Sequence, residues 1–349
     1  MSAATPKLIK ELREKSGAGM LDCKKALVAT EGNLEEAIKH LREAGLSKAA
    51  KKSSNVAAEG LVSMLVNDDN TKVTMVELNS QTDFVAKNTE FLNLKDEVTA
   101  HVQTTGVTST EELNKTTING TTFEEYLNSR IAIIGENIVA RKMITVSTDA
   151  GVVNGYVHLG KVGVVLAATC APEVKEKATD LLKKVAMHAA SMKPTVISYK
   201  DLAADFIESE NKGIIADIEK LNIELHRLGK PEKKIPLFVS RTQLTDAALA
   251  QAEDDMKAEL KAQGKPEKIW DKIIPGQIAR FITDNTQLDT THALLSQPYV
   301  MDDSMTVEQA IKACDESIEI VEYVRYELGD GIEKKEEDFA AEVAAQMAK

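Results

Sequence analysis

Cysteine is scarce in this sequence, and its spacing excludes the common cysteine-based sites. The 349 residues contain three cysteines, Cys23, Cys170 and Cys314, without any CxxC pair. Such isolated cysteines cannot build the disulfide framework of a small secreted domain. Each one lies among apolar neighbours, which favours burial as a small apolar side chain. The sequence therefore predicts a protein of a reducing compartment.

Long apolar runs are missing as well. The longest run, VGVVLAATCA at 162–171, falls far short of the ~20 apolar residues that a membrane-spanning helix needs. The N-terminal MSAATPKLIKELREKSG lacks the apolar centre of a signal peptide. We therefore expect a soluble, cytoplasmic protein with no membrane contact.

Positive charge is in deficit. The formal net charge of -12 argues against a protein that mainly neutralises the phosphates of a nucleic acid, so we expect no direct nucleic-acid partner. A basic surface on a protein partner fits this balance better.

Catalytic and metal-binding motifs are also lacking. The histidines show no HExxH spacing and no cluster with cysteine. The stretch GYVHLGKV at 155–162 follows the phosphate-loop pattern GxxxxGK[ST] until Val162, which stands where a hydroxyl should ligate magnesium. A strand, not a helix, is expected after it, so no anion cradle forms. We expect no enzyme, no catalytic residue, no metal site and no cofactor.

The N-terminal region predicts a head of three short helices. Thr5 before a proline starts the first helix and Gly17 ends it. A second helix covers 20–30, and a third runs from an Asn33 cap to a stop at Gly45. The lysine-rich SKAAKKSSNVAAE that follows is expected to be a solvated connector, with helix allowed by its alanines.

Beyond the connector the hydrophobic period changes to that of β-strands. Apolar, β-branched runs at 60–66 and 72–79 flank the turn-rich NDDNT and predict a β-hairpin. A helix follows, because apolar residues recur at steps of three and four. These residues are Phe91, Leu94, Val98 and Val102. Residues 123–135 predict a further helix and 137–147 a further strand.

The same plan occurs a second time. Runs at 152–159 and 162–169 flank Gly160-Lys161, a loop expected to form a type II′ turn. Pro172 then opens a helix whose apolar face comprises Val174, Ala178, Leu181, Val185 and Met192. The pattern predicts an internally duplicated α+β core.

Strand character disappears between 200 and 284. A seven-residue spacing predicts a coiled-coil seam, formed by Ile207, Ile214, Ile218, Leu221, Leu225 and Leu228. GKPEK occurs at 229–233 and again at 264–268, each time at the end of a helical stretch. We expect an inserted antiparallel helical hairpin, partly duplicated and interrupted by the β-like LFVSRT. Its seam either closes the hairpin on itself or offers a face to another subunit.

The remaining segments complete the α+β fold class. Strand character returns at 296–301 and 318–328, with a helix from about Val307 between them, and 336–348 predicts a last helix. The expected organisation is a head and connector (1–53), a first core half (54–145), a second core half (146–199 and 286–335), the helical insertion (200–285) and a C-terminal helical module (336–349).

The stretch NSQTDFVAK at 79–87 joins the first hairpin to its helix. Ser80 or Thr82 can cap that helix, and Asp83 in the first turn suits the helix dipole. Phe84 lies seven residues before Phe91, so a regular helix would place it on the core face. An exposed phenylalanine here would instead be a wedge for a partner's pocket. The spacing leaves both alternatives open.

Several motifs closely resemble those of the bacterial elongation factor Ts family, nucleotide-exchange factors for the GTPase elongation factor Tu. The resemblance is carried by KLIKELREKSGAGMLDCKKAL, KAAKKSSNVAAEG and NSQTDFVAK, and continues through GENI, VAMHAASMKP, QPYVM and GDGIEKKEEDFAAEVAA. It covers nearly the whole chain in order. The family's architecture is a ubiquitin-associated-like three-helix head, a core of two similar halves, a helical hairpin insertion and a terminal helix.

The resemblance implies a partner and contact residues. It implies that the head docks on the GTPase domain of elongation factor Tu, with Arg13, Met20 and Leu21 in the matching loop. Dimerisation of the complex through the coiled coil is the corresponding expectation if the heptad seam offers its face to another subunit. The insertion departs from the family pattern, which has a single Gly-Lys-Pro tip.

The resemblance also implies how the exchange works. Thr82, Asp83, Phe84 and Val85 match the segment that dislodges magnesium from the partner's nucleotide site. His158 matches a histidine that contacts the partner's barrel domain. The implied function is GDP release and GTP loading; the alternative is a scaffold or chaperone-like stabiliser of the same GTPase that does not drive exchange.

Overall fold

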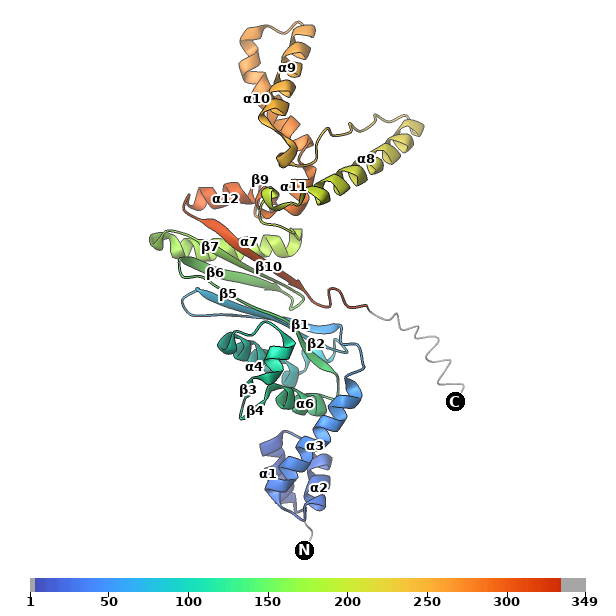
Figure 1. Ribbon diagram of the computed structural model, residues 1–349, viewed down its shortest axis with the longest axis vertical. Helices are drawn as coiled ribbons and strands as arrows, with labels where there is room; N and C mark the ends of the chain where they lie inside the picture. The colour runs from blue at the N-terminus through green and yellow to red at the C-terminus, as the bar shows by residue number, and fades with distance from the viewer. Residues whose placement is uncertain (1–3, 334–349) are drawn as a thin grey trace. The chain divides into compact units, whose positions relative to one another are not determined.

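The computed structural model describes residues 4–333 (Figure 1). The chain divides into two compact units, one comprising residues up to Val165 and from Val324 on, the other Leu166–Tyr323. The boundary runs through two strands, β7 (Val162–Thr169) and β10 (Glu319–Glu327). Both units combine helices with short antiparallel strands, so the α+β class is confirmed. The last predicted helix, 336–348, lies outside the described residues.

The first unit begins with the three predicted helices, α1 (Pro6–Ser16), α2 (Met20–Ala29) and α3 (Leu34–Lys52). The caps predicted at Thr5, Gly17 and Asn33 are confirmed. The Thr5 hydroxyl accepts a hydrogen bond from the Leu8 N–H at 3.3 Å, and Gly17 ends α1 in the left-handed conformation with φ 67°. Buried Leu12, Cys23, Ala26, Leu27 and Ala37 form the core between the helices.

Helix α3 does not end at Gly45, so that prediction is wrong. It continues to Lys52 and takes in the first part of the connector. Gly45 lies inside the helix, buried, where an added Cβ would be 3.5 Å from the Ala132 Cβ in α6 (Phe123–Ile134). Ala49, one turn further on, joins the buried cluster around α6. Packing against α6 therefore outweighs the ~1 kcal/mol that glycine costs within a helix.

Three antiparallel strands form the first sheet in the order β1-β2-β5, and both predicted hairpin strands are confirmed. Their bounds are β1 (Glu59–Val66), β2 (Lys72–Ser80) and β5 (Ile138–Ser147). Helices α4 (Thr89–Thr105) and α6 lie on one side of this sheet (Figure 1). The predicted face of α4, which includes Phe91 and Val98, is buried against it. Shorter elements between α4 and α6 are α5 (Thr110–Lys115), β3 (Thr117–Ile118) and β4 (Thr121–Thr122).

Strand β6 (Gly151–His158) and the first residues of β7 lie against the other face of this sheet. Glycine is required at this approach: a Cβ at Gly163 would lie 2.7 Å from Val62 Cγ1 in β1. A Cβ at Gly155 would lie 2.4 Å from the carbonyl oxygen of Val164 in the same hairpin. The second sheet has the strand order β10-β7-β6.

The turn between β6 and β7 is not of the predicted type. Leu159 and Gly160 both have positive φ, 50° and 68°, and the Lys161 N–H donates to the His158 carbonyl at 2.9 Å. This is a type I′ turn centred one residue earlier than expected. The Val62 N–H donates to the Gly160 carbonyl, so contact with β1 holds the turn in place. The phosphate-loop-like GYVHLGKV is thus a β-hairpin.

In the second unit the predicted helix after Pro172 is α7 (Lys175–Met192). Four of the five predicted apolar-face residues are buried, but Met192 at the C-terminal end is 40% exposed. His188 is fully buried on this helix. Its Nε2 donates to Gln297 Oε1 at 3.0 Å, while its Nδ1 accepts from the Val300 N–H at 3.2 Å.

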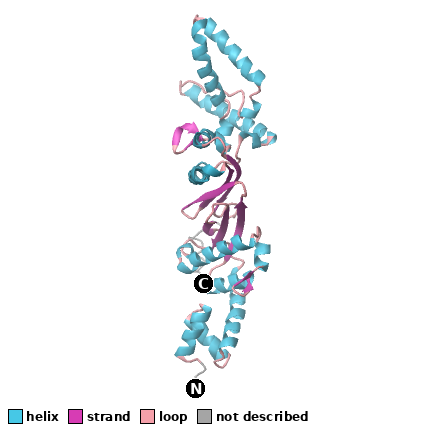
Figure 2. Ribbon diagram, turned by 90° about the vertical axis from the view of Figure 1, so that its left-hand side faces the viewer, coloured by secondary structure: helices cyan, strands magenta, loops and turns pink. Residues whose placement is uncertain are grey.

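The insertion forms a hairpin from different helices than predicted. Helix α8 (Ala204–Arg227), which carries the heptad seam, has no antiparallel helical partner among the described residues. Only Ile207 of it is buried, and near its start the Phe206 ring lies 5.2 Å from the His292 ring. Figure 1 shows α8 apart from the helical hairpin of the insertion. The hairpin consists of α9 (Asp246–Ala262) and α10 (Trp270–Asp284), which lie side by side (Figures 1 and 2). An interhelical seam through α8 is therefore wrong for this chain taken alone.

Both GKPEK motifs end a helix in the same way, as predicted. Gly229 and Gly264 have φ of 63° and 69°. The lysine that follows each glycine donates its N–H to a leucine carbonyl five residues back, at 2.9 Å and 3.0 Å. This is the Schellman arrangement that glycine favours.

The LFVSRT stretch is not a strand, because side chains in place of a neighbouring strand satisfy its N–H groups. Asn285 Oδ1 accepts from Leu237 and Phe238, and Gln243 Oε1 accepts from Val239. Before it, Asn222 and Lys233 exchange two hydrogen bonds of 2.7 Å and 2.8 Å, which tie the extended chain to α8.

The second unit ends with short elements, among them the helix predicted from Val307. They are α11 (Gln287–His292), β8 (Pro298–Tyr299), β9 (Asp302–Thr306) and α12 (Val307–Cys314). Single 3-10 turns occur at Val85–Lys87 in the first unit and, in the second, at Pro172–Val174, Tyr199–Asp201, Arg241–Gln243, Glu267–Ile269 and Leu294–Ser296.

Candidate functional site

The TDFV segment lies between β2 and α4 and belongs to neither. Helix α4 begins at Thr89 and is capped by Asn88, whose side chain accepts from the Glu90 N–H at 2.8 Å. The prediction that Ser80 or Thr82 caps this helix is therefore wrong. The separate 3-10 turn at Val85–Lys87 precedes the cap.

Phe84 is 79% exposed, among the most exposed large apolar side chains of the described residues. The helical spacing from Phe91, which favoured the core, fails because the chain leaves the helix at Asn88. The structure therefore selects the alternative in which Phe84 projects to solvent. About 25 cal/mol is at stake for each Å² of apolar area that stays hydrated, so this side chain holds apolar area that contact with another molecule could bury.

The residues on either side of Asp83 and Phe84 are fixed to the fold. Val85 and Ala86 are buried in the cluster that contains Phe91. Thr82 is held by Glu136, which precedes β5: the Thr82 N–H donates to Glu136 Oε2 at 3.0 Å and its hydroxyl to Oε1 at 2.6 Å. The segment is thus anchored at both ends and presents only its middle.

Asp83 is paired within the segment. Lys87 Nζ lies 3.0 Å from Asp83 Oδ2, and this hydrogen bond lowers the pKa of Asp83. The same ammonium lies 5.9 Å from the centre of the Phe84 ring, within reach of a cation–π interaction. An ionised carboxylate and an aromatic ring are therefore displayed together, with a cation beside both.

The head presents a second exposed surface. Met20 and Leu21, in the first turn of α2, are 60% and 64% exposed, and Arg13 is exposed on α1. They surround the loop between α1 and α2, where the Gly17 N–H donates to the Arg13 carbonyl at 2.8 Å. Two apolar side chains beside a guanidinium have the composition of a protein-binding patch.

His158 lies at the tip of the β6–β7 hairpin. Its Nδ1 is 3.0 Å from the Tyr156 hydroxyl, and the neighbouring Leu159 is 80% exposed. Leu159 also has positive φ, a conformation that Asn or Gly adopts more easily. An exposed leucine in such a turn adds apolar surface next to the histidine.

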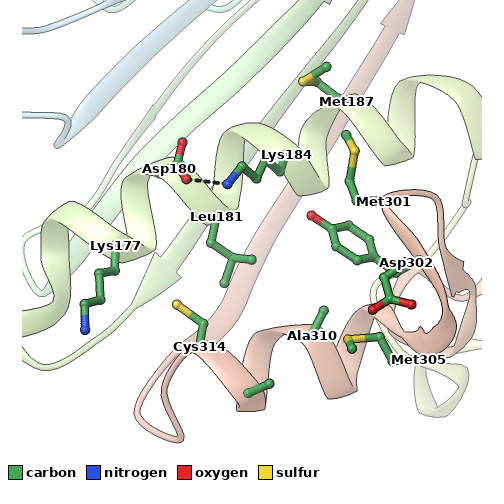
Figure 3. Close-up of a pocket in the computed structure, with 12 residues that line it drawn as sticks. Lys177, Asp180, Leu181, Lys184, Met187, Met301, Asp302, Met305, Ala310 and Cys314 are labelled. Carbon is green, nitrogen blue, oxygen red and sulfur yellow. Dashed lines mark ion pairs between the residues drawn. The ribbon is translucent and has the colours of Figure 1, made fainter.

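Hollows in the second unit do not contain any of these residues. The groove in Figure 3, about 710 Å³, lies between α7, α12 and the β8–β9 hairpin and is lined largely by apolar side chains such as Leu181, Met301 and Met305. Of its two lysines, Lys184 is paired with Asp180 at 2.7 Å. Nothing in the groove pairs a nucleophile with a base.

Clusters of metal ligands and membrane-spanning helices are absent from the part of the chain that the structure describes. Residues 4–333 hold no group of three or more His, Cys, Asp or Glu side chains placed to bind a metal ion. No helix within that range is long and apolar enough to cross a membrane.

Two residues of the site were missed by sequence reasoning. Lys87 stands four residues after Asp83, and this spacing is a readable signal for an ion pair. Glu136 contacts Thr82 across 54 positions of sequence, so only the strand pairing reveals it.

Known proteins that are similar to this chain over nearly its whole length share one name. A family described as Elongation factor TS matches residues 81–330. Elongation factor Ts of Aliarcobacter butzleri strain RM4018 is 65% identical, with 100% of both chains covered. The protein of the same name from Campylobacter curvus strain 525.92 is 55% identical over 98% of this chain and 99% of its own, and that of Helicobacter hepaticus 51% over 99% and 100%.

Proposed function

Because the chain belongs to the elongation factor Ts family, we propose that it binds elongation factor Tu with GDP bound and promotes GDP release, so that GTP can load. The observation that carries this proposal is the anchored segment with exposed Asp83 and Phe84. A rigid turn that projects one aromatic ring and one carboxylate is suited to entering a pocket on another protein. The chain itself performs no bond-making step in this function.

The physical target is the partner's phosphate site. In such GTPases, backbone amides and a bound magnesium ion hold the nucleotide's phosphates. When Phe84 inserts, it displaces packing beside that site and so weakens the binding of magnesium. The Asp83 carboxylate brings negative charge near the phosphates and repels them. Both changes weaken the binding of GDP. By linkage, the nucleotide weakens this chain's binding by the same factor, so GTP later expels it.

The magnitudes are compatible. Accelerating release ~1000-fold requires lowering the barrier by about 4 kcal/mol. Burying an aromatic side chain of ~150 Å² at ~25 cal/mol/Å² yields a similar gross figure. Phe84 is exposed in the free protein, so nearly all of this area is available to the complex. Ordering costs reduce the net gain, and further contacts must supply the rest.

The other two exposed surfaces supply those contacts. Met20 and Leu21, with Arg13, dock the head on the partner's GTPase domain, and the His158 turn touches a second domain of the partner. The head has the three-helix arrangement expected of a ubiquitin-associated-like docking domain. In this proposal, the head and the His158 turn bind the partner, and Phe84 and Asp83 disturb its nucleotide site.

The test is release of a fluorescent GDP from elongation factor Tu, measured with the wild-type chain and with Phe84→Ala, beside a binding assay. We expect rapid release with wild type and at least a tenfold slower maximal rate with Phe84→Ala, while the complex still forms. Met20→Ala serves as the matched control, because it removes an exposed apolar side chain from the head. It should lower the affinity for the partner more than it lowers the maximal rate of GDP release. Wild type that binds without accelerating release would leave only a scaffold function.

A further inference from the structure

We propose that Glu136 is a positioning residue for exchange: its carboxylate clamps Thr82 and thereby sets the direction in which Phe84 projects. This inference rests on the proposed function. It assigns Thr82 a role inside the fold, whereas Asp83 and Phe84 carry the contact with the partner.

Each polar group of Thr82 already has a hydrogen-bond partner within the fold. Its N–H and its hydroxyl both donate to Glu136, at 3.0 Å and 2.6 Å, and its carbonyl accepts from the Ser80 hydroxyl at 3.0 Å. Hydrogen bonds to an ionised carboxylate are the stronger kind, and two to one residue fix orientation as well as position. The backbone one residue before Asp83 is therefore held rigidly.

Strand register explains why Glu136 is the residue that reaches Thr82. Ser80, the last residue of β2, pairs with Ile138, the first of β5. Continuing the same antiparallel pairing beyond the strand ends places Thr82 opposite Glu136. Gly135, in the left-handed conformation with φ 87°, ends α6 and turns the chain into this position.

A β-bulge sets that register. Glu77 pairs with Lys142 but Leu78 pairs with Ala140, so Arg141 is the extra residue. Without the bulge, the pairing of the first part of β2 would place Thr82 opposite Asn137. Arg141 binds the buried Glu77 carboxylate through Nε and Nη2 at 2.9–3.1 Å, which stabilises the bulge.

The opposite end of the segment is fixed independently. Val85 is buried in the core cluster, so Asp83 and Phe84 are the two residues between a polar clamp and an apolar anchor. Loss of the clamp frees one end only. We therefore expect a chain that still binds its partner but whose aromatic ring samples several directions, and such misplacement lowers a rate by about tenfold or more.

The experiment measures the maximal rate of fluorescent GDP release and the affinity for nucleotide-free elongation factor Tu in the full chain. The variants are Glu136→Ala, Glu136→Gln and Phe84→Ala, together with the Glu136→Ala/Phe84→Ala double variant. Glu112→Ala is the matched control, since Glu112 also accepts from a backbone N–H, that of Thr108 at 3.1 Å, outside the segment.

We expect Glu136→Ala to lower the maximal rate about tenfold with affinity changed little, Glu136→Gln to recover part of it, and Glu112→Ala to match wild type. In the Phe84→Ala background Glu136→Ala should have no further effect, because residues acting through one another are not additive. If Glu136 had only a structural role, the double variant would lose the product of the two single-variant rate factors.

Some outcomes overturn the proposal. A normal rate for Glu136→Ala, or independent effects in the double variant, contradicts the clamp while the exchange function stands. Wild type that fails to accelerate GDP release contradicts the exchange function itself. If Glu136→Ala does not fold, Thr82→Val against Thr82→Ser carries the same test, with loss expected only for valine because it lacks the donating hydroxyl.

Discussion

Lys87 and Asp83 form an ion pair of 3.0 Å at the base of the exposed Phe84. The pair connects the first residue of the displayed turn to the residue that ends it, and the hydrogen bond that Lys87 donates lowers the pKa of Asp83. Asp83 is therefore ionised throughout the neutral range.

The first prediction concerns this carboxylate. In Lys87→Met the pKa of Asp83 should rise towards its ordinary value of 3.8, because the donated hydrogen bond and the positive charge are both lost. A depressed pKa in the folded state stabilises the fold above the unfolded value, and that contribution is lost as the pH falls through the folded value. Side-chain NMR titration of Asp83 checks this. An unchanged titration curve would show that Lys87 does not hold the carboxylate in solution.

The second prediction concerns Gly45. Gly45→Ala should raise the midpoint of thermal unfolding, because the added methyl meets Ala132 at an ordinary 3.5 Å and alanine gains about 0.5–1 kcal/mol over glycine within a helix. Gly45→Leu should lower the midpoint by forcing α3 away from α6. Had the helix ended at Gly45 in the left-handed conformation, alanine would destabilise the protein, so the sign of the change decides the matter.

The third prediction concerns pH. Burial lowers the pKa of His188, and the Val300 N–H requires an unprotonated Nδ1. The unfolded chain therefore takes up a proton at a higher pH than the folded one, and the stability is lost as the pH falls below the ordinary value of 6.5 and through the folded pKa.

Unfolding midpoints measured from about pH 7 to pH 5 should decline less steeply in His188→Asn than in wild type, since asparagine still accepts from Val300 without titrating. The slope of His101→Asn is measured for comparison. Burial lowers the pKa of His101 too, but its ring contacts a hydroxyl, that of Thr116, which can donate or accept and so does not require an unprotonated ring nitrogen. Equal slopes for wild type and His188→Asn would exclude His188 as the source.

The fourth prediction concerns the bulge. Glu77 is fully buried and binds Arg141, the Asn79 amide and the Gly329 N–H. Arg141→Ala leaves the fully buried Glu77 carboxylate poorly compensated and should destabilise the protein by about 3 kcal/mol or more. Glu77→Ala should destabilise it less, because the remaining Arg141 guanidinium is partly exposed to solvent. The double variant should cost less than both single changes together. Denaturant unfolding measures this, and strictly additive losses would mean that the two side chains do not interact.

Local sequence information was sufficient where neighbouring residues satisfy one another. Thr5, Asn33 and the two Gly-Lys-Pro ends are caps made within a few positions, and they occur as predicted. The hairpin strands follow from their period and turn residues. The Schellman ends of α8 and α9 are correct although the partner assumed for α8 is wrong, because a cap depends only on its own helix.

The same reasoning was insufficient where contacts outside the repeating pattern decide. Helical spacing left a buried and an exposed Phe84 both open, and the exposed one is found, because Asn88 caps a later helix start and Val85 takes the buried position. The heptads of α8 predicted a helical partner, but a Schellman end and the Asn222 hydrogen bonds direct the chain away as an extended segment. The domain boundaries and the contact residues for elongation factor Tu stay predictions.

By itself, the sequence determined the α+β class, the family and the position of most of the longer helices and strands, whereas short elements such as α5, β3, β4, α11 and β9 were not predicted. Period, capping and turn chemistry act over a few residues and are therefore legible along the chain. The tertiary structure alone decided that α3 passes through Gly45, that Phe84 faces solvent and that Glu136 holds Thr82. These depend on packing and strand register between residues far apart in sequence, where long-range contact energy outweighs local preference.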